Sequence, residues 1–91
     1  MHIRWTLAAA ADLENITDYL LERFPHLAQS TVNDLYMDIR SLRTTPHRGR
    51  PGREEGTREL VSTRLPYVTV YRLKGSAVEI LHIWHGARDR D

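Results

Sequence analysis

The stretch Gly49–Val61, GRPGREEGTRELV, separates two kinds of sequence pattern and thereby decides the fold. Before it, apolar residues recur with the period of a helix; after it, they recur with the period of a strand. Three glycines, a proline and three arginines lie within it. Glycine and proline at this density predict a loop over residues 46–56. We therefore expect a helical part and a β part joined by a basic loop.

The part before the loop predicts two helices. Residues 7–24 place apolar side chains three or four positions apart, at Ala9, Leu13, Ile16, Leu20 and Phe24. Residues 26–46 repeat this spacing at Ala28, Val32, Leu35, Ile39 and Leu42. Each set forms one stripe of an amphipathic helix. Thr6 suits the N-cap of the first helix, and Pro25 marks its end. So short a connection favours an antiparallel hairpin.

The remaining segments predict strands. Residues 2–5 alternate polar and apolar side chains, residues 58–61 form an ambiguous strand, and residues 67–73 and 77–85 are rich in β-branched and aromatic residues around a KGS turn. Simple alternation places Val78, Ile80, His82 and Trp84 on one face of the last strand. The predicted class is α+β, in the order β-α-α-β-β-β. We expect an antiparallel sheet, with residues 2–5 at its edge or middle and the helical hairpin packed on one face.

Length and composition limit the alternatives. A chain of 91 residues with 41% hydrophobic and 27% charged residues is expected to form one globular domain, residues 1–91. Its predicted parts are a helical hairpin at about 7–44, a basic loop at 45–57 and a β-meander at about 58–86. No cysteine is present, which excludes disulfides and thiolate metal sites. Without a signal-peptide or membrane-span pattern, we expect a cytoplasmic protein that does not contact a membrane.

Charge is unevenly distributed along the chain. Residues 1–39 carry six acidic residues against two arginines, whereas residues 40–58 carry six arginines against two acidic residues. This separation predicts a basic surface suited to a polyanion or to an acidic protein segment. The alternative is that these arginines are simply solvated in a surface loop.

Four motifs in order carry a family resemblance: DLENITDYL in the first helix, then GRPGREEGTRELV, YVTVYRL and VEILHIWHGARD. Together they resemble the RelE/ParE superfamily of bacterial toxins, over essentially the whole chain. The resemblance implies a toxin of a type II toxin–antitoxin module, neutralised by a cognate antitoxin whose C-terminal segment wraps it. It also implies one of two targets, because RelE-like members cleave mRNA on the ribosome and ParE-like members poison DNA gyrase.

The residues favour the ParE-like branch. RNA cleavage without a metal needs a base, an acid and a cationic cluster. Arg88 matches the late arginine of RelE-like nucleases, but Glu59, Val61 and Val68 stand where such nucleases would have cations. We therefore expect a gyrase poison. The alternatives are a ribosome-dependent endoribonuclease and a non-toxic scaffold that still binds the antitoxin. For the nuclease, the candidate catalytic residues are Arg88, His85 and Arg58.

Other candidate residues would contact the target or the antitoxin. They are Arg48, Arg50, Arg53, Arg58, Arg64, Tyr67, Tyr71, Arg72 and Trp84. Arg58 has a structural alternative, an ion pair with Glu59, Glu79 or an acid of the first helix. His82 and His85 are three positions apart on a strand and so face opposite ways, which argues against a shared metal ion. The resemblance implies no cofactor.

Overall fold

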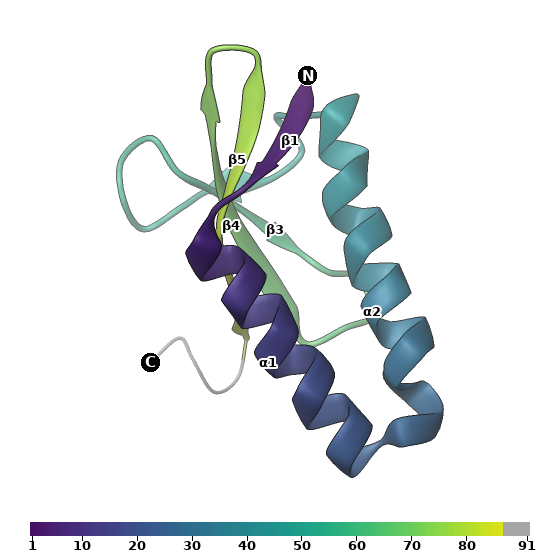
Figure 1. Ribbon diagram of the computed structural model, residues 1–91. Coiled ribbons are helices and arrows are strands. Elements are labelled where there is room, and N and C mark those ends of the chain that lie inside the picture. Colours follow the sequence, from purple (N-terminus) through teal and green to yellow (C-terminus); the bar gives the residue numbers. More distant parts are fainter. Residues whose placement is uncertain (87–91) are drawn as a thin grey trace.

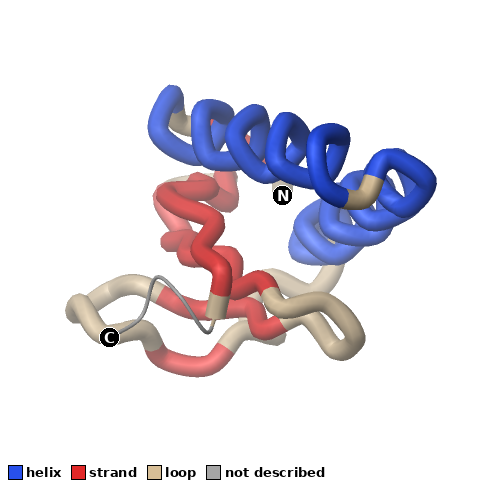
Figure 2. Tube along the Cα trace, turned by 90° about the horizontal axis from the view of Figure 1, so that it is seen from below, coloured by secondary structure: helices blue, strands red, loops and turns tan. Residues whose placement is uncertain are grey.

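A computed structural model describes residues 1–86 and shows a five-stranded sheet covered by two helices (Figure 1). In chain order the elements are β1 (His2–Trp5), α1 (Leu7–Arg23), α2 (Pro25–Arg40), the 3-10 helix η1 (Ser41–Arg43), β2 (Arg50–Pro51), β3 (Arg58–Val61), β4 (Tyr67–Lys74) and β5 (Ala77–His85). Both helices cover the same side of the sheet (Figure 2). The predicted α+β class is thus confirmed.

The helices begin and end where the sequence indicates. Thr6 caps α1, because its hydroxyl oxygen accepts a hydrogen bond from the Ala9 N–H at 3.2 Å. Pro25 occupies the first position of α2, where its missing N–H costs no helical hydrogen bond. Phe24 alone separates the two helices. It is 45% exposed, so the predicted apolar stripe of α1 ends at buried Leu20 and not at Phe24.

The sheet has the strand order β1-β5-β4-β3-β2 and is mixed. Strands β3, β4 and β5 pair antiparallel, as predicted. Strand β1 lies at the edge, as one of the two predicted positions, but pairs parallel with β5. The loop prediction also needs a correction, since Arg50 and Pro51 form the short edge strand β2 against β3. Proline is tolerated there because an edge strand has one side without ladder partners.

A β-bulge reverses the faces of β5. Tyr71 pairs with Ile80, but the preceding Val70 pairs with His82, which leaves Leu81 as the extra residue. Beyond Leu81, residues that simple alternation would point outward therefore point inward. The predicted grouping of His82 and Trp84 with Val78 and Ile80 was wrong for this reason.

One hydrophobic core lies between the helices and the sheet. Side chains from both helices meet alternate residues of β4 and β5, and the cluster comprises Ala9, Leu35, Ile39, Leu42, Leu60, Tyr67, Tyr71, Val78, Ile80 and Ile83. Leu13 and Ile16 of the predicted α1 stripe pack against it. The core thus lies on the helix-covered face of the sheet, and the polar strand residues lie on the opposite face.

Candidate functional site

The side of the sheet turned away from the helices carries the polar residues of the strands. Residues paired across strands point to the same side, so the register assigns this face. We define the open face as Arg4, Arg50, Glu59, Val68, Val70, Arg72, Glu79, His82 and Trp84. It contains three of the predicted contact residues, Arg50, Arg72 and Trp84.

Glu79 joins two arginines at the centre of the open face. Arg72 Nε donates to Glu79 Oε1 at 2.6 Å, and Arg4 Nη1 donates to Oε2 at 3.0 Å. The side chain of Glu79 is 9% exposed. Its hydrogen bonds from Arg72 and Arg4 lower the pKa of the carboxyl group, outweighing the effect of burial. Glu79 therefore neutralises cations from two different strands.

Glu59 forms the second buried carboxylate of the open face. Arg50 donates to Glu59 Oε1 through Nη2 at 3.1 Å and through Nε at 3.3 Å. Glu59 is 3% exposed, and this ion pair with the partly exposed Arg50 fixes β2 against β3. Arg50, predicted to contact a partner, is thus occupied within the chain.

An Asp–His pair lies where β5 emerges beyond the end of β1. Asp12 of α1 accepts a hydrogen bond from the Ile83 N–H at 3.0 Å, which replaces the strand partner missing there. The same oxygen lies 3.2 Å from His82 Nδ1. The other ring nitrogen, Nε2, can therefore form a hydrogen bond with a different group. The His82 ring stacks on Trp84, with centroids 5.7 Å apart.

A cleft of about 470 Å³ opens beside this pair. Residues of the basic loop and of three strands line it, together with the start of α1: Thr6, Ala8, Arg53, Glu54, Thr57, Glu59, Val70, Leu81, His82 and Trp84. Of the predicted contact residues, Arg53 and Trp84 therefore share one cleft. The sequence did not indicate that His82 would join them in the cleft, held by Asp12.

Tyr71 and Arg58 hold the basic loop from its inner side. Tyr71 Oη donates to the Pro46 carbonyl at 2.7 Å and accepts from the Gly49 N–H at 2.9 Å. Burial raises the pKa of the Tyr71 hydroxyl, although the Gly49 hydrogen bond and nearby arginines act in the opposite direction. Arg58 Nη1 donates to the Gly49 carbonyl at 2.8 Å and to the His47 carbonyl at 3.3 Å.

These contacts change several predicted roles. Tyr71 is fully buried and Tyr67 nearly so, which means that neither lines a groove in this structure. They do share a face, but that face is the core. Arg58 serves the fold, as its structural alternative anticipated, but its partners are backbone carbonyls and not carboxylates.

The remaining predicted residues lie apart from one another. Arg48 donates to the Ser41 hydroxyl, and Arg64 lies 3.9 Å from Asp34 of α2. His85 packs edge-on against Tyr67 on the helix side of the sheet, opposite to His82. Arg88 lies outside the described residues. Of the proposed catalytic set, Arg58 and His85 are described, and the register places them four residues of β4 apart, beside Tyr71 and Tyr67 respectively.

Within residues 1–86, no three side chains of histidine, aspartate or glutamate gather closely enough to hold a metal ion. No helix in that part of the chain has the length and apolar character needed to cross a membrane.

Comparison with known proteins identifies the family. Residues 3–90 match the profile described as ParE toxin of type II toxin-antitoxin system, parDE. The chain is 40% identical over 83 residues to Y4kP of Sinorhizobium fredii, covering 91% of this chain and 85% of that protein. It is 39% identical over 84 residues to Toxin RelE2 of Caulobacter vibrioides, covering 92% and 93% of the two chains.

A solved structure agrees with this assignment. The chain superposes on a protein of the chromosomal ParDE toxin–antitoxin system of P. aeruginosa with a TM-score of 0.86. The two are 33% identical, over 93% of this chain and 95% of that chain. Sequence, fold and element order thus agree, and the predicted RelE/ParE resemblance is confirmed. The chain belongs to the ParE toxin family of type II toxin–antitoxin systems.

Proposed function

We propose that this toxin inhibits growth by poisoning DNA gyrase, as a binding protein that performs no chemistry on RNA. The observation that carries the proposal is the state of the cations on the open face. Arg4 and Arg72 are paired with Glu79, and Arg50 is paired with Glu59. A ribonuclease needs cations whose charge is directed at the phosphate in the transition state. Cations neutralised by buried carboxylates are poorly suited to that task.

The uncharged positions support the same proposal. Val68 and Val70 are buried between the ion pairs and Trp84, and Val68 stands where a nuclease of the RelE type would carry a basic residue. The partly exposed ring of Trp84, which is paired with Val68, is the apolar group here that can contact another protein. The cleft beside Asp12 and His82 adds a polar rim to this apolar strip.

A ribosome-dependent endoribonuclease is the second candidate, and one observation favours it. Asp12 holds the ring of His82 at the open face through Nδ1, an arrangement that suits a general acid or base. The likeness to a protein named Toxin RelE2 is consistent with this candidate as well.

The partner that controls the toxin is a cognate antitoxin, in keeping with the ParDE system to which the solved relative belongs. We propose that the antitoxin's C-terminal segment wraps the toxin and that acidic residues in it meet Arg48 and Arg53. Both arginines are exposed on the basic loop. Gyrase would then bind a surface of the toxin that the antitoxin does not cover, or one that is exposed when the antitoxin dissociates.

The test compares the two targets directly. Purified toxin is added to a gyrase supercoiling assay and, separately, to translating ribosomes with a defined mRNA. We expect inhibited supercoiling with accumulation of cleaved DNA, and intact mRNA. In cells that lack the antitoxin, induction should give filaments and a DNA damage response rather than immediate arrest of translation.

Variants separate the outcomes. Cleavage of mRNA that disappears in both His82→Ala and Arg88→Ala, with folding retained, would replace the gyrase proposal by the nuclease. Inactivity in both assays, together with normal antitoxin binding, would identify a non-toxic scaffold. Glu14→Gln, an exposed change on α1, serves as the matched control in each assay.

A further inference from the structure

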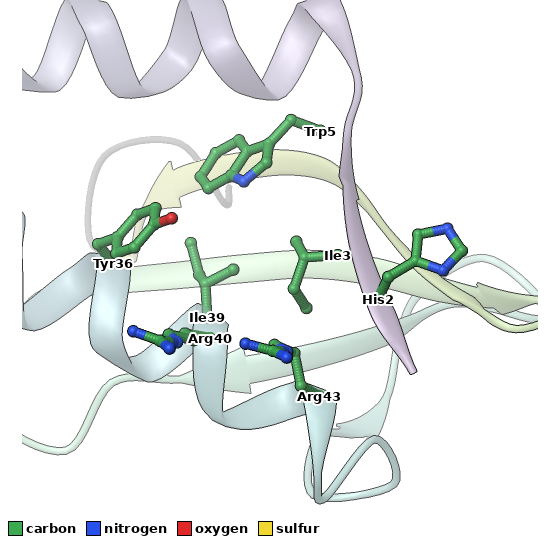
Figure 3. A pocket seen from close by; sticks show the side chains of 7 residues that line it. All are labelled: His2, Ile3, Trp5, Tyr36, Ile39, Arg40 and Arg43. Atoms are coloured by element: carbon green, nitrogen blue, oxygen red, sulfur yellow. The ribbon is translucent and has the colours of Figure 1, made fainter.

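A second cleft lies on the helix side of the sheet, between β1 and the end of α2 (Figure 3). Its volume is about 470 Å³, and its lining residues are His2, Ile3, Trp5, Tyr36, Ile39, Arg40 and Arg43. Trp5 points to the same side of the sheet as its core partner Ile80, so this cleft is separate from the open face. None of the roles assigned above uses it.

Two parallel aromatic rings face each other across the cleft, Trp5 from β1 and Tyr36 from α2. The rings of Trp5 and Tyr36 are 6.4 Å apart between centroids and inclined by only 5°. Tyr36 is 49% exposed, although an aromatic ring gains stability from burial. A flat ligand stacked on one ring would therefore lie parallel to the other as well.

Two arginines lie on the same helical wall as Tyr36. Arg40 follows Tyr36 by four positions and Arg43 follows Arg40 by three, so all three lie along one side of α2 and η1. Figure 3 shows the Arg40 and Arg43 side chains beyond Ile39, across from Trp5. Within residues 1–86, no carboxylate forms an ion pair with either guanidinium group, in contrast to the paired arginines of the open face. The charge of this wall is thus available to an anion.

We propose that this cleft binds single-stranded nucleic acid. One base stacks on the exposed ring of Tyr36, parallel to Trp5, and the phosphates on either side of it contact Arg40 and Arg43. Parallel aromatic faces beside unpaired cations are the two elements by which proteins hold single strands without reading their sequence. In a duplex the bases are stacked on one another, so this wall can reach only an unpaired base.

The combination of groups favours nucleic acid over an acidic peptide. A peptide carboxylate would satisfy the arginines, but it would not need two parallel rings. A nucleotide uses the rings and the cations together. The cleft also stands at the start of the basic segment 40–58, which can follow the backbone of a longer strand.

Fluorescence anisotropy with labelled oligothymidylate of about ten nucleotides tests the proposal, since single-strand sites span that range. Tyr36→Ala should weaken binding about tenfold, the usual loss for one stacked base. Tyr36→Phe keeps the stacking face and should bind like the parent. Tyr36 is half exposed, so both variants should fold, and their thermal midpoints verify this.

The salt dependence of binding distinguishes the contribution of the arginines from that of the stacked aromatic ring. The slope of log K against log salt should fall by about 0.7 for each of Arg40→Gln and Arg43→Gln, the value for one phosphate contact on a single strand. Tyr36→Ala should leave that slope unchanged. Arg23→Gln is the matched control, because Arg23 also lies near an aromatic ring, that of Tyr19, but at the far end of α1.

An abasic oligonucleotide of the same length completes the design. The parent should bind it about tenfold more weakly than oligothymidylate, and Tyr36→Ala should bind both equally. The proposal is overturned if the parent binds both equally, or if no binding occurs at about 50 mM salt. It is also overturned if a Trp-containing polyglutamate peptide shows the Tyr36 dependence that oligothymidylate lacks. Gyrase inhibition is measured in the same variants, and its retention would show that the two proposals stand apart.

Discussion

Gly49 approaches Tyr71 so closely that no other residue fits there. A Cβ on Gly49 would lie 2.6 Å from Tyr71 Oη and 2.7 Å from Cε1, and Tyr71 is fully buried. We expect Gly49→Ala to lower the free energy of unfolding by about 1–3 kcal/mol, the usual cost of overpacking. Urea denaturation measures this. In the control Gly86→Ala, the new Cβ would lie 3.5 Å from the Pro66 carbonyl oxygen, an ordinary contact, so the effect should be small. Equal stability of the two variants would contradict the close approach.

Glu79 should make the free energy of unfolding depend on pH in the acidic range. Its hydrogen bonds with Arg72 and Arg4 lower the carboxyl pKa in the folded state, below its ordinary value of 4.5. The unfolded state therefore binds the proton first as pH falls. The contribution of Glu79 is complete above about pH 4.5 and is lost as pH drops through the lower folded-state pKa. Glu79→Gln should be less stable than the parent at neutral pH.

The gap between Glu79→Gln and the parent should close in acid. Urea midpoints at neutral pH and at about pH 3 provide the comparison. Glu14→Gln, on the exposed side of α1, should follow the parent at both pH values. A gap of the same size at both would mean that the ionised carboxylate is not what holds Arg4 and Arg72.

Removing the hydroxyl group of Thr69 should increase the stability of the protein. It is 1% exposed, and among the described residues its Oγ1 has no hydrogen-bond partner. An unsatisfied buried hydroxyl costs about 1–3 kcal/mol, whereas an apolar group of the same shape avoids this cost. Thr69→Val should therefore raise the free energy of unfolding by about 1 kcal/mol. The control is Thr63→Val, at an exposed position in the loop that follows β3, which should have little effect on stability. A loss of stability in Thr69→Val would show that the Thr69 hydroxyl has a hydrogen-bond partner.

The arginines of the basic loop should divide into two classes. Arg50→Ala leaves buried Glu59 without this partner, so we expect a loss of about 1–3 kcal/mol in stability. Arg48→Ala and Arg53→Ala should change stability by less than about 0.5 kcal/mol. They should instead slow association with the antitoxin in a manner that weakens with added salt, because exposed charges steer encounter. Stopped-flow association rates at several salt concentrations test this. An unchanged rate for both variants would place the antitoxin away from the basic loop.

The sequence predicted the helices and the antiparallel strands because their signals are local. The spacing of Ala28, Leu35 and Ile39 defines a helix face without reference to the rest of the chain. The parallel pairing of β1 with β5 joins segments more than seventy residues apart, and no local pattern specifies its direction. The bulge at Leu81 could not be predicted either, because β5 has apolar residues on both faces and its alternation pattern does not show which residues face the core.

The functional residues were predicted less well than the fold for a related reason. A basic loop is evident from composition, but which arginines are neutralised depends on Glu59 and Glu79, which lie on strands that pair in space. The Asp12–His82 pair joins α1 to β5 only because β1 ends at Trp5 and exposes the edge beside Ile83. Neither cleft has a motif of its own.

The parallel contact between the first and the last strand also has a consequence for synthesis on the ribosome. Strand β1 is made first, but its only strand neighbour, β5, is made last among the described elements. Until β5 has left the ribosome, Trp5 and Ile3 lack their sheet partners and the helices lack the residues that fill the core. Non-local pairing of this kind delays folding to the end of translation. A nascent chain that stops before β5 therefore cannot complete the toxin fold.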